Sequence, residues 1–465
     1  MVTVPDVVRR RLAPPGRFTP NFWLVAILVT GIGLVLRLVN LSHPKETIFD
    51  EVYYANEAWD LLQHGVEWNP EDNTPQYVVH PPLGKWMIGL GEQLFGYNSF
   101  GWRIMAVVVG TASIALITMA AWRLFRSTVL AGTAGLLMSL DGMHFVLSRA
   151  ALLDIFLMFW IVVAFYFLVL DREQRRANVL ASRAVFPWYR IACAVSLGLA
   201  CGVKWSGLWY LALFAIAVAV FDLGAARCAD RPMRLTPAAG WALAVVGIAA
   251  LAYLATWWGW FASDDGYFRH WSGNALVSLW HYHEEAYKFH TTLDKPHPYQ
   301  SWPWQWLLLG RPVLFYWTGA GQCGAQGCAS SILLLGTPLL WWSFIPALFG
   351  LGWLAIARRD GRAWLVLLAA LTGILPWFQS MPAHRTMFIF YALPAEPFLI
   401  LAVVYVLGAI IGRPHTEHRR IGALAAGAYV LLVAACFAYF YPIYSGMDIT
   451  YTQWLSRMWL GSRWV

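Results

Sequence analysis

The sequence has few charged residues. Only 12% of its 465 residues are Asp, Glu, Lys or Arg, which is about half of the roughly 25% typical of soluble domains. By contrast, 59% are hydrophobic, and long apolar runs recur along most of the chain. A soluble fold could not bury so many apolar runs. The chain is therefore predicted to be an all-α, polytopic membrane protein, because lipid cannot hydrogen-bond an exposed backbone.

Cysteines and metal-binding patterns are also scarce. Of six cysteines, only Cys323 and Cys328, in "CGAQGC", lie close together. Two thiols do not complete a metal coordination shell, but a disulfide is expected if their loop is extracytoplasmic. His281 and His283 are two positions apart and share no helical face, and no "HExxH" pattern occurs. We expect neither a metal nor another cofactor.

Basic residues outnumber acidic ones, and the net charge is +8. In a soluble protein this excess could indicate nucleic-acid binding. Here the Lys and Arg residues lie in short loops between apolar runs, so the positive-inside rule explains them better. No nucleic-acid partner is expected.

About eleven membrane-spanning helices are expected, near residues 21–41, 102–124, 128–147, 151–170, 189–204, 206–222, 240–262, 332–357, 363–379, 386–411 and 420–441. The basic tail is placed in the cytoplasm, which puts all later basic clusters on the same side. The first apolar run lacks a small-residue cleavage site and is read as a retained helix. The resulting regions are a cytoplasmic tail (1–20), an N-terminal membrane region (21–262) with a first outer loop (42–101), a second outer loop (263–331), a four-helix membrane region (332–441) and an outer tail (442–465).

Two adjacent acids, Asp50 and Glu51, stand out in "FDEVYY" of the first outer loop. Residues 50–64 and 83–95 have the spacing of amphipathic helices lying at the membrane interface. Adjacent helical side chains diverge by about 100°, so the two acids are not expected to share one proton. One would face the bundle and the other a substrate. Capping of a helix N-terminus is an equally good explanation at this point.

Further charged residues are predicted on the same side of the membrane as candidate substrate contacts: Arg103, Arg149, Asp154, Lys204 and Arg385. Asp154 interrupts the apolar run "ALLDIFLMFW", and an intramembrane carboxylate is a functional candidate by default; the alternative is an ion pair with Arg103 or Arg149. Lys204 and Arg385 are candidate contacts for a lipid phosphate, with snorkelling toward the interface as the alternative for Lys204.

The stretch "VVHPPLGK" presents His80 and Lys85 on a turn stiffened by two prolines, and it is either a binding element or a structural turn. Carboxylates can accept a proton from a hydroxyl, and cations can stabilise a phosphate leaving group. Together these groups suit the transfer of a group carried on a lipid phosphate. They would also suit an anion transporter or a proton-coupled carrier, but the two large outer loops favour an enzyme.

Five ordered motifs resemble those of the protein O-mannosyltransferases, in particular the actinobacterial membrane enzymes. They are "IFDEVYYANEAWDLL", "HPPLGKWMIGLGEQLFGYNSFGWRI", "DGMHFVLSRAALLDIFLMFW", "CGVKWSGLW" and "KPHPYQSWPWQWLLLGRPV". The resemblance implies the GT-C glycosyltransferase fold and a metal-independent, inverting transfer of mannose. The donor would be polyprenyl-phosphate mannose, and the acceptor a Ser or Thr hydroxyl of a secreted or translocating protein. A related GT-C enzyme acting on a glycolipid or cell-wall acceptor stays open.

The resemblance also implies roles for individual residues. Asp50 would be the catalytic base, Glu51 would orient the acceptor, and Arg103 would lie near the phosphate or the acid pair. Lys204 and Arg385 would bind the phosphate. The active site would face the outside of the plasma membrane. Eukaryotic members carry a β-trefoil insert for which residues 263–331 are too short, so acceptor selection would rest on loops, the membrane core or the translocation machinery.

Overall fold

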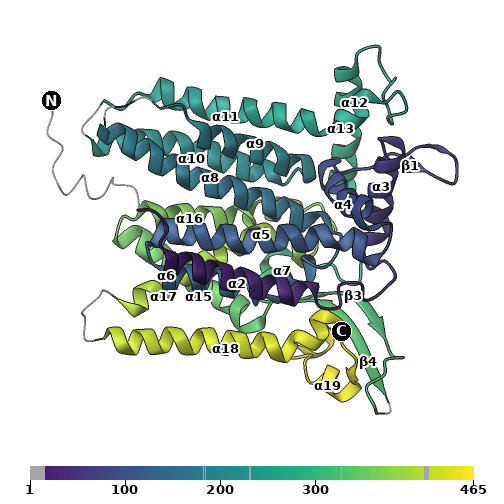
Figure 1. The fold of residues 1–465 in the computed structure, drawn as a ribbon. Helices are drawn as coiled ribbons and strands as arrows, with labels where there is room; N and C mark the ends of the chain where they lie inside the picture. Colours follow the sequence, from purple (N-terminus) through teal and green to yellow (C-terminus); the bar gives the residue numbers. More distant parts are fainter. Residues whose placement is uncertain are drawn as a thin grey trace.

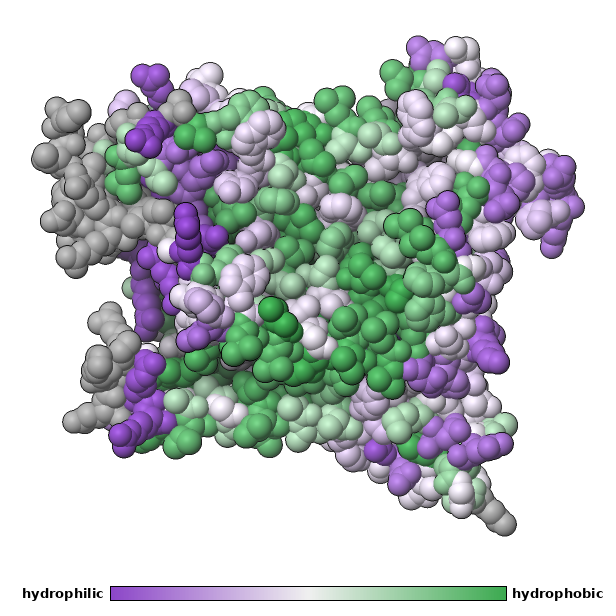
Figure 2. Space-filling model, in the orientation of Figure 1, coloured by the Kyte–Doolittle hydropathy of each residue, from purple (hydrophilic) through white to green (hydrophobic). Residues whose placement is uncertain are grey.

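The computed structural model describes residues 16–181, 183, 185–229, 232–325, 327–412 and 418–464. Most of the predicted cytoplasmic tail (1–15) and of the basic loop "GRPHTEHRR" (413–417) lies outside these residues. The helices run side by side in one bundle, and a layer of shorter helices and strands covers one end of it (Figure 1). We call this end the capped end. On the molecular face in Figure 2, a broad hydrophobic band separates two polar ends.

Within the described ranges, nine helical segments are long and apolar enough to cross a membrane: α2 (Pro20–Leu38), α5 (Ser99–Phe125), α8 (Leu153–Ala181), α10 (Gly207–Cys228), α11 (Leu235–Thr256), α15 (Pro338–Ala357), Gly361–Ser380, Ile389–Ile411 and α18 (Arg419–Ser445). Two shorter apolar helices, α6 (Thr128–Ser139) and α9 (Trp188–Val203), accompany them. The prediction of a multi-pass membrane protein with about eleven apolar helices is confirmed, and the chain is mostly helical with a few short strands outside these helices.

Four predicted spans are not single helices. The seventh is α11 followed by the short helix α12 (Trp258–Ala262), and three others also divide. The third divides into α6 and α7 (Gly142–Leu147) because Asp141 caps a new helix by accepting a hydrogen bond from His144 N at 3.0 Å. The ninth is α16 (Gly361–Thr372) followed by the 3₁₀ helix η1 (Leu375–Ser380), where Pro376 cannot continue an α-helix. The tenth begins as the 3₁₀ helix η2 (Ile389–Ala395) and continues as α17 (Glu396–Ile411).

The first outer loop folds largely as predicted. It contains α3 (Glu51–His64) and α4 (Leu83–Phe95), which pack against each other and are connected through the short hairpin β1 (Trp68–Asn69) and β2 (Thr74–Pro75). Both helices lie in the layer over the capped end (Figure 1). Gly65 ends α3 with φ of 78°, a left-handed conformation in which glycine is unstrained.

The second predicted loop contains much more regular structure than expected. It includes α13 (Ala275–Thr292), α14 (Pro303–Trp306), β3 (Val313–Thr318) and the first part of β4 (Cys328–Leu334), which continues into the eighth predicted span. In the C-terminal tail, β5 (Ile449–Thr450) extends the sheet in the order β3-β4-β5 and is followed by α19 (Tyr451–Leu455). Cys323 and Cys328 form a disulfide in the β3–β4 connection.

One buried carboxylate joins the N-terminal helices to the C-terminal ones. Besides capping α7, Asp141 accepts hydrogen bonds through Oδ2 from Thr337 N (3.1 Å) and Trp341 Nε1 (2.7 Å) at the start of α15. Its side chain thereby satisfies three buried donors, counting His144 N.

The mutation Asp141→Ala is expected to lower the thermal unfolding midpoint of the detergent-solubilised protein. Each of the three buried donors would lose its acceptor, at a cost of about 1–3 kcal/mol per group. Asp264→Ala is the matched control, since the Asp264 side chain is 93% exposed. Equal midpoints for the two variants would contradict this account of how the two halves are joined.

Candidate active site

Asp50 and Glu51 lie at the start of α3 in different surroundings. Asp50 occupies the N-cap position but makes no side-chain capping hydrogen bond, so the capping alternative does not describe it. Glu51, the first helical residue, is completely buried, whereas Asp50 is only half-buried. The two acids therefore have different tasks.

The Glu51 carboxylate is saturated with hydrogen bonds. Its Oε1 accepts from Arg103 Nε and Ala151 N, both at 2.9 Å. Its Oε2 accepts from Arg103 Nη2 at 2.7 Å and from Ile48 N at 3.0 Å. No acceptor position remains for a substrate, so this carboxylate holds protein segments together.

Arg103 is equally occupied. Besides binding Glu51, its guanidinium donates to three carbonyl oxygens of the loop that connects α2 to α3: Leu41 O (3.3 Å), Pro44 O (2.7 Å) and Glu46 O (3.1 Å). The side chain is 1% exposed. Of the two positions expected for Arg103, near the phosphate or near the acid pair, the structure shows the second.

The Asp50 carboxylate, in contrast, receives no hydrogen bond from any group in the described part of the chain. Burial raises the pKa of Asp50 to about 6, although the positive charge of Lys204 opposes that shift and the negative charge of Asp154 adds to it. A carboxylate with free lone pairs and a pKa near neutrality is suited to accept a proton.

Asp154 forms its ion pair with Lys204, not with either arginine considered from the sequence. Lys204 Nζ lies 2.7 Å from Asp154 Oδ2, and both residues are buried. Asp154 stands in the first turn of α8, and Lys204 directly follows α9. The ammonium also lies over the rings of Phe390 (5.9 Å) and Tyr391 (5.7 Å). One carboxylate thus only partly satisfies a cation that has three donors.

The Asp154–Lys204 pair faces a cavity of about 520 Å³ beneath the layer of short helices and strands at the capped end. Arg385 is also in its wall; its Nε donates to His290 O at 2.8 Å, whereas its buried Nη1 has no hydrogen-bond partner. The remaining wall includes an aromatic set formed by Trp205, Trp209, Tyr287, Trp377 and Tyr391. The cavity therefore presents two cations whose donors the described part of the protein satisfies only in part.

His80 and His290 complete this wall, with ring centroids 5.2 Å apart. Burial, reinforced by the positive charge of Lys204, holds the pKa of His80 well below its usual range. Burial together with Arg385 lowers the pKa of His290 to about 4. Both imidazoles are therefore neutral at pH 7, and the hydrogen bond between His290 Nε2 and Val79 O (3.1 Å) connects α13 to the first outer loop.

Lys85 and Arg149, two of the predicted substrate contacts, do not line this cavity and bind groups within the protein instead. Lys85 is fully buried in an ion-pair cluster with Glu67 and Glu57, whose charges offset the effect of burial and raise its pKa. The Arg149 guanidinium donates to carbonyl oxygens of the last residues of α2 and just beyond, at Arg37 O (2.6 Å), Val39 O (2.7 Å) and Asn40 O (3.1 Å). Both cations stabilise the fold around the site.

An apolar groove, also of about 520 Å³, adjoins the cavity and shares Trp205, Leu208 and Tyr287 with it. It lies among α9, α10, α11 and α13, and its remaining lining is mostly aliphatic and aromatic. Neither this groove nor the contribution of α13 to the walls of the cavity and the groove was predicted from the sequence. The only signal in "HYHEEAYKFH" was its density of histidine and tyrosine, which the sequence analysis considered only as a potential metal site.

Within the described ranges, no group of three His, Cys, Asp or Glu side chains has the arrangement of a metal site. The charged and imidazole side chains around the cavity are two cations, two neutral imidazoles and one carboxylate that is ion-paired with Lys204.

Comparison with known proteins gives consistent matches along the chain. Residues 27–263 match the family model "Dolichyl-phosphate-mannose-protein mannosyltransferase", and residues 275–464 match "C-terminal four TMM region of protein-O-mannosyltransferase". Polyprenol-phosphate-mannose–protein mannosyltransferases of Mycolicibacterium smegmatis and Corynebacterium glutamicum are similar. The first is 39% identical over 97% of this chain and 95% of its own length, and the second 34% identical over 94% and 92%.

Solved structures show the same fold. A chain of the S. cerevisiae protein O-mannosyltransferase Pmt1–Pmt2 complex bound to the sugar donor has a TM-score of 0.82 at 15% identity, covering 100% of this chain and 95% of that chain. ArnT from Cupriavidus metallidurans bound to undecaprenyl phosphate has a TM-score of 0.54 at 18% identity, covering 91% and 71%. The predicted GT-C fold is confirmed. With these family matches across nearly its whole length, the chain belongs to the dolichyl-phosphate-mannose–protein mannosyltransferase family.

Proposed function

We propose that this protein transfers mannose from polyprenyl-phosphate mannose to Ser or Thr hydroxyls of protein acceptors, with inversion at the anomeric carbon and without a metal. The observation that carries the mechanism is the placement of Asp50, whose carboxylate has no hydrogen-bond partner in the described chain and experiences the charge of Lys204 in the cavity wall. Family membership supports the reaction, and the geometry supports the division of roles.

The donor would bind across the cavity and the apolar groove. Its phosphate would contact Lys204 Nζ and the open Nη1 of Arg385, which are the cations of the cavity wall. Its polyprenyl chain would follow the groove that continues past Trp205 and Leu208. A charged head and an apolar tail thus each meet a matching surface.

In the transfer step, Asp50 would accept the proton of the acceptor hydroxyl as its oxygen attacks the anomeric carbon. The new bond joins that oxygen to the sugar, and the bond from the sugar to the phosphate oxygen breaks with its electron pair remaining on phosphate. The leaving phosphate is a stable anion, so it requires cations but no general acid. Attack opposite the leaving group inverts the anomeric carbon.

Glu51 would be a positioning residue in this mechanism. Its four hydrogen bonds to Arg103, Ala151 and Ile48 fix the start of α3, and Asp50 is the preceding residue. This assignment replaces the contact with the acceptor that was expected from the sequence, because the Glu51 carboxylate has no free acceptor position.

We further propose that the capped end faces the outside of the plasma membrane, which places the site at the outer leaflet. The disulfide between Cys323 and Cys328 lies in this layer and suits an oxidising compartment. The acceptors would then be secreted proteins. They would reach the site at the membrane surface as the translocation machinery delivers them.

The reaction is tested with purified protein in liposomes, radiolabelled polyprenyl-phosphate mannose and a Ser/Thr-rich peptide, with a chelator present. Label in the peptide supports the proposal. Label in a glycolipid or glycan fraction instead would favour the alternative GT-C transferase, and translocation of the donor without any product would favour a transporter.

The mutation Asp50→Asn is expected to reduce peptide labelling by roughly 10²–10⁴-fold, the usual contribution of a general base. The thermal unfolding midpoint should not fall, because this carboxylate accepts no hydrogen bond. Asp60→Asn, the same change within α3, is the matched control and should retain activity. Near-normal transfer by the Asp50 variant would exclude Asp50 as the base.

The rate should also depend on pH through Asp50. Since its pKa is raised to about 6, the carboxylate becomes protonated below that pH and can no longer accept the hydroxyl proton. We expect kcat/KM for the peptide to fall about tenfold per pH unit below 6 and to level off above 7. The residual activity of Asp50→Asn should lack this step, and a wild-type midpoint near 4 would contradict the assignment.

The mutation Arg385→Gln is expected to raise KM for the donor by about tenfold or more, because it removes a charge-assisted hydrogen bond to the phosphate. Arg385→Lys should retain part of the affinity. Arg463→Gln is the control, as Arg463 is an exposed arginine outside the cavity wall. An unchanged KM in Arg385→Gln would show that the phosphate binds elsewhere.

A further inference from the structure

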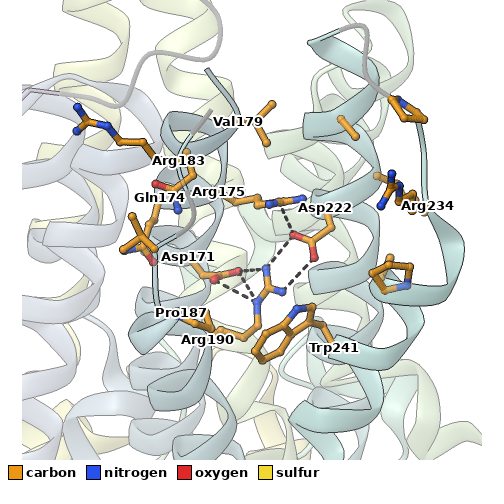
Figure 3. Close-up of a pocket in the computed structure, with 17 residues that line it drawn as sticks. Asp171, Gln174, Arg175, Val179, Arg183, Pro187, Arg190, Asp222, Arg234 and Trp241 are labelled. Carbon is orange, nitrogen blue, oxygen red and sulfur yellow. Dashed lines mark hydrogen bonds and ion pairs between the residues drawn. The ribbon is translucent and has the colours of Figure 1, made fainter. Parts of the chain in front are cut away.

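A second cavity, of about 630 Å³, lies at the end of the bundle opposite the capped end (Figure 3). It is enclosed by the last turns of α8, the start of α9, the end of α10 and the start of α11. Asp171 in its wall and Asp154 in the active-site cavity are both on α8, and a rise of 1.5 Å per residue separates them by roughly 25 Å. This cavity therefore cannot be part of the active site.

One side of this cavity is a buried ion-pair cluster. Arg190 lies between Asp171 and Asp222, and its Nη2 donates to an oxygen of each at 2.9 Å (Figure 3). Arg175 Nε lies 3.1 Å from Asp222 Oδ1, and Trp241 packs against the Arg190 guanidinium at 5.1 Å. Two guanidinium groups thus balance two carboxylates, which makes this side charge-neutral and well ordered.

The cavity also contains cations that this cluster does not balance. Arg234, which immediately precedes α11, lies across the cavity from Arg175 in Figure 3, whereas Arg183, which follows α8, lines the rim of the cavity and directs its guanidinium outward. In the part of the chain that the structure describes, the side chains of Arg183 and Arg234 have no hydrogen-bond or ion-pair partner. The Nη groups of Arg175 likewise contact no acceptor there. Four arginines and two aspartates line the cavity, an excess of two positive charges.

The rest of the lining is apolar and continues onto a lipid-facing helix. Val179, Leu223 and Pro237 contribute to the wall. On α11, Leu235 and Leu243 are more than 70% exposed in the isolated chain, which indicates a surface that contacts membrane lipid. An anion alone would use only the arginines, whereas an amphiphile would use both kinds of surface.

We propose that this cavity binds the phosphate headgroup of an anionic phospholipid from the leaflet opposite the active site. The phosphate would lie between Arg234 and the open Nη groups of Arg175, with Arg183 adding positive charge at the rim and the acyl chains along α11. Basic pockets between membrane helices are suited to such headgroups. Binding would connect the end of α8 to the start of α11, so the lipid would stabilise these helices against each other. The inference is independent of the mannosyl transfer reaction.

The test uses the full-length wild-type protein in detergent and measures lipid retention by native mass spectrometry, together with the thermal unfolding midpoint. The probes are phosphatidylglycerol, phosphatidylcholine and inorganic phosphate. The double variant Arg183→Gln/Arg234→Gln is compared with Arg183→Lys/Arg234→Lys, which keeps both charges. Arg358→Gln, an exposed arginine directly after α15 at the same end of the bundle, is the control.

We expect phosphatidylglycerol to bind at least tenfold more tightly than phosphatidylcholine and to raise the unfolding midpoint. The Gln double variant should lose this preference, and the Lys double variant and Arg358→Gln should keep it. If millimolar inorganic phosphate displaces the lipid and stabilises the protein by itself, the phosphate site stands and its natural ligand is a soluble phosphate. Equal binding of both lipids by a folded wild-type protein, or an undiminished preference in the Gln double variant, would overturn the proposal.

Discussion

The active site depends on the buried ion pair between Glu51 and Arg103. This pair connects α3 to α5, to the loop that leaves α2 and, through Ala151 N, to the segment before α8. Breaking a buried pair by removing one partner leaves an uncompensated charge and is strongly destabilising. The adjacent residue, Asp50, therefore has a fixed backbone and a side chain without a structural hydrogen bond. Glu51 makes the hydrogen bonds that fix the start of α3. Because Asp50 is not needed for this task, its carboxylate is available for the proposed proton transfer.

The same contrast separates the cations of the site. Lys85, Arg103 and Arg149 direct their donors at carboxylates or backbone carbonyls. They stabilise the layer at the capped end and connect it to the helices of the bundle. Lys204 and Arg385 face a cavity with donors that the protein does not use up. The number of internal partners, more than charge or burial, distinguishes a structural cation from one that can bind a phosphate.

Much of the helical fold could be predicted from the sequence. Lipid cannot hydrogen-bond the backbone, so the long apolar runs predict the helices, and the amphipathic spacing of 50–64 and 83–95 predicts α3 and α4. The division of the third span at Asp141 was not predicted. An aspartate can cap a helix, but aspartates also occur within membrane-spanning helices, so the residue type alone does not mark a helix start. The partners of Lys85, Arg149 and Asp154 could not be predicted, since each contact joins segments far apart in the chain. The helix α13 was not predicted, because its histidines were interpreted only as a potential metal site.

Chemical rescue tests most directly whether the two adjacent acids have different roles. Peptide labelling is measured for Asp50→Gly and Glu51→Ala with increasing formate, using protein whose fold and donor binding have been verified. A small carboxylate can replace a missing base in solution, but it cannot rebuild the four hydrogen bonds that fix the start of α3. The account predicts that formate restores transfer to Asp50→Gly and not to Glu51→Ala. Rescue of the Glu51 variant, with none for the Asp50 variant, would contradict it.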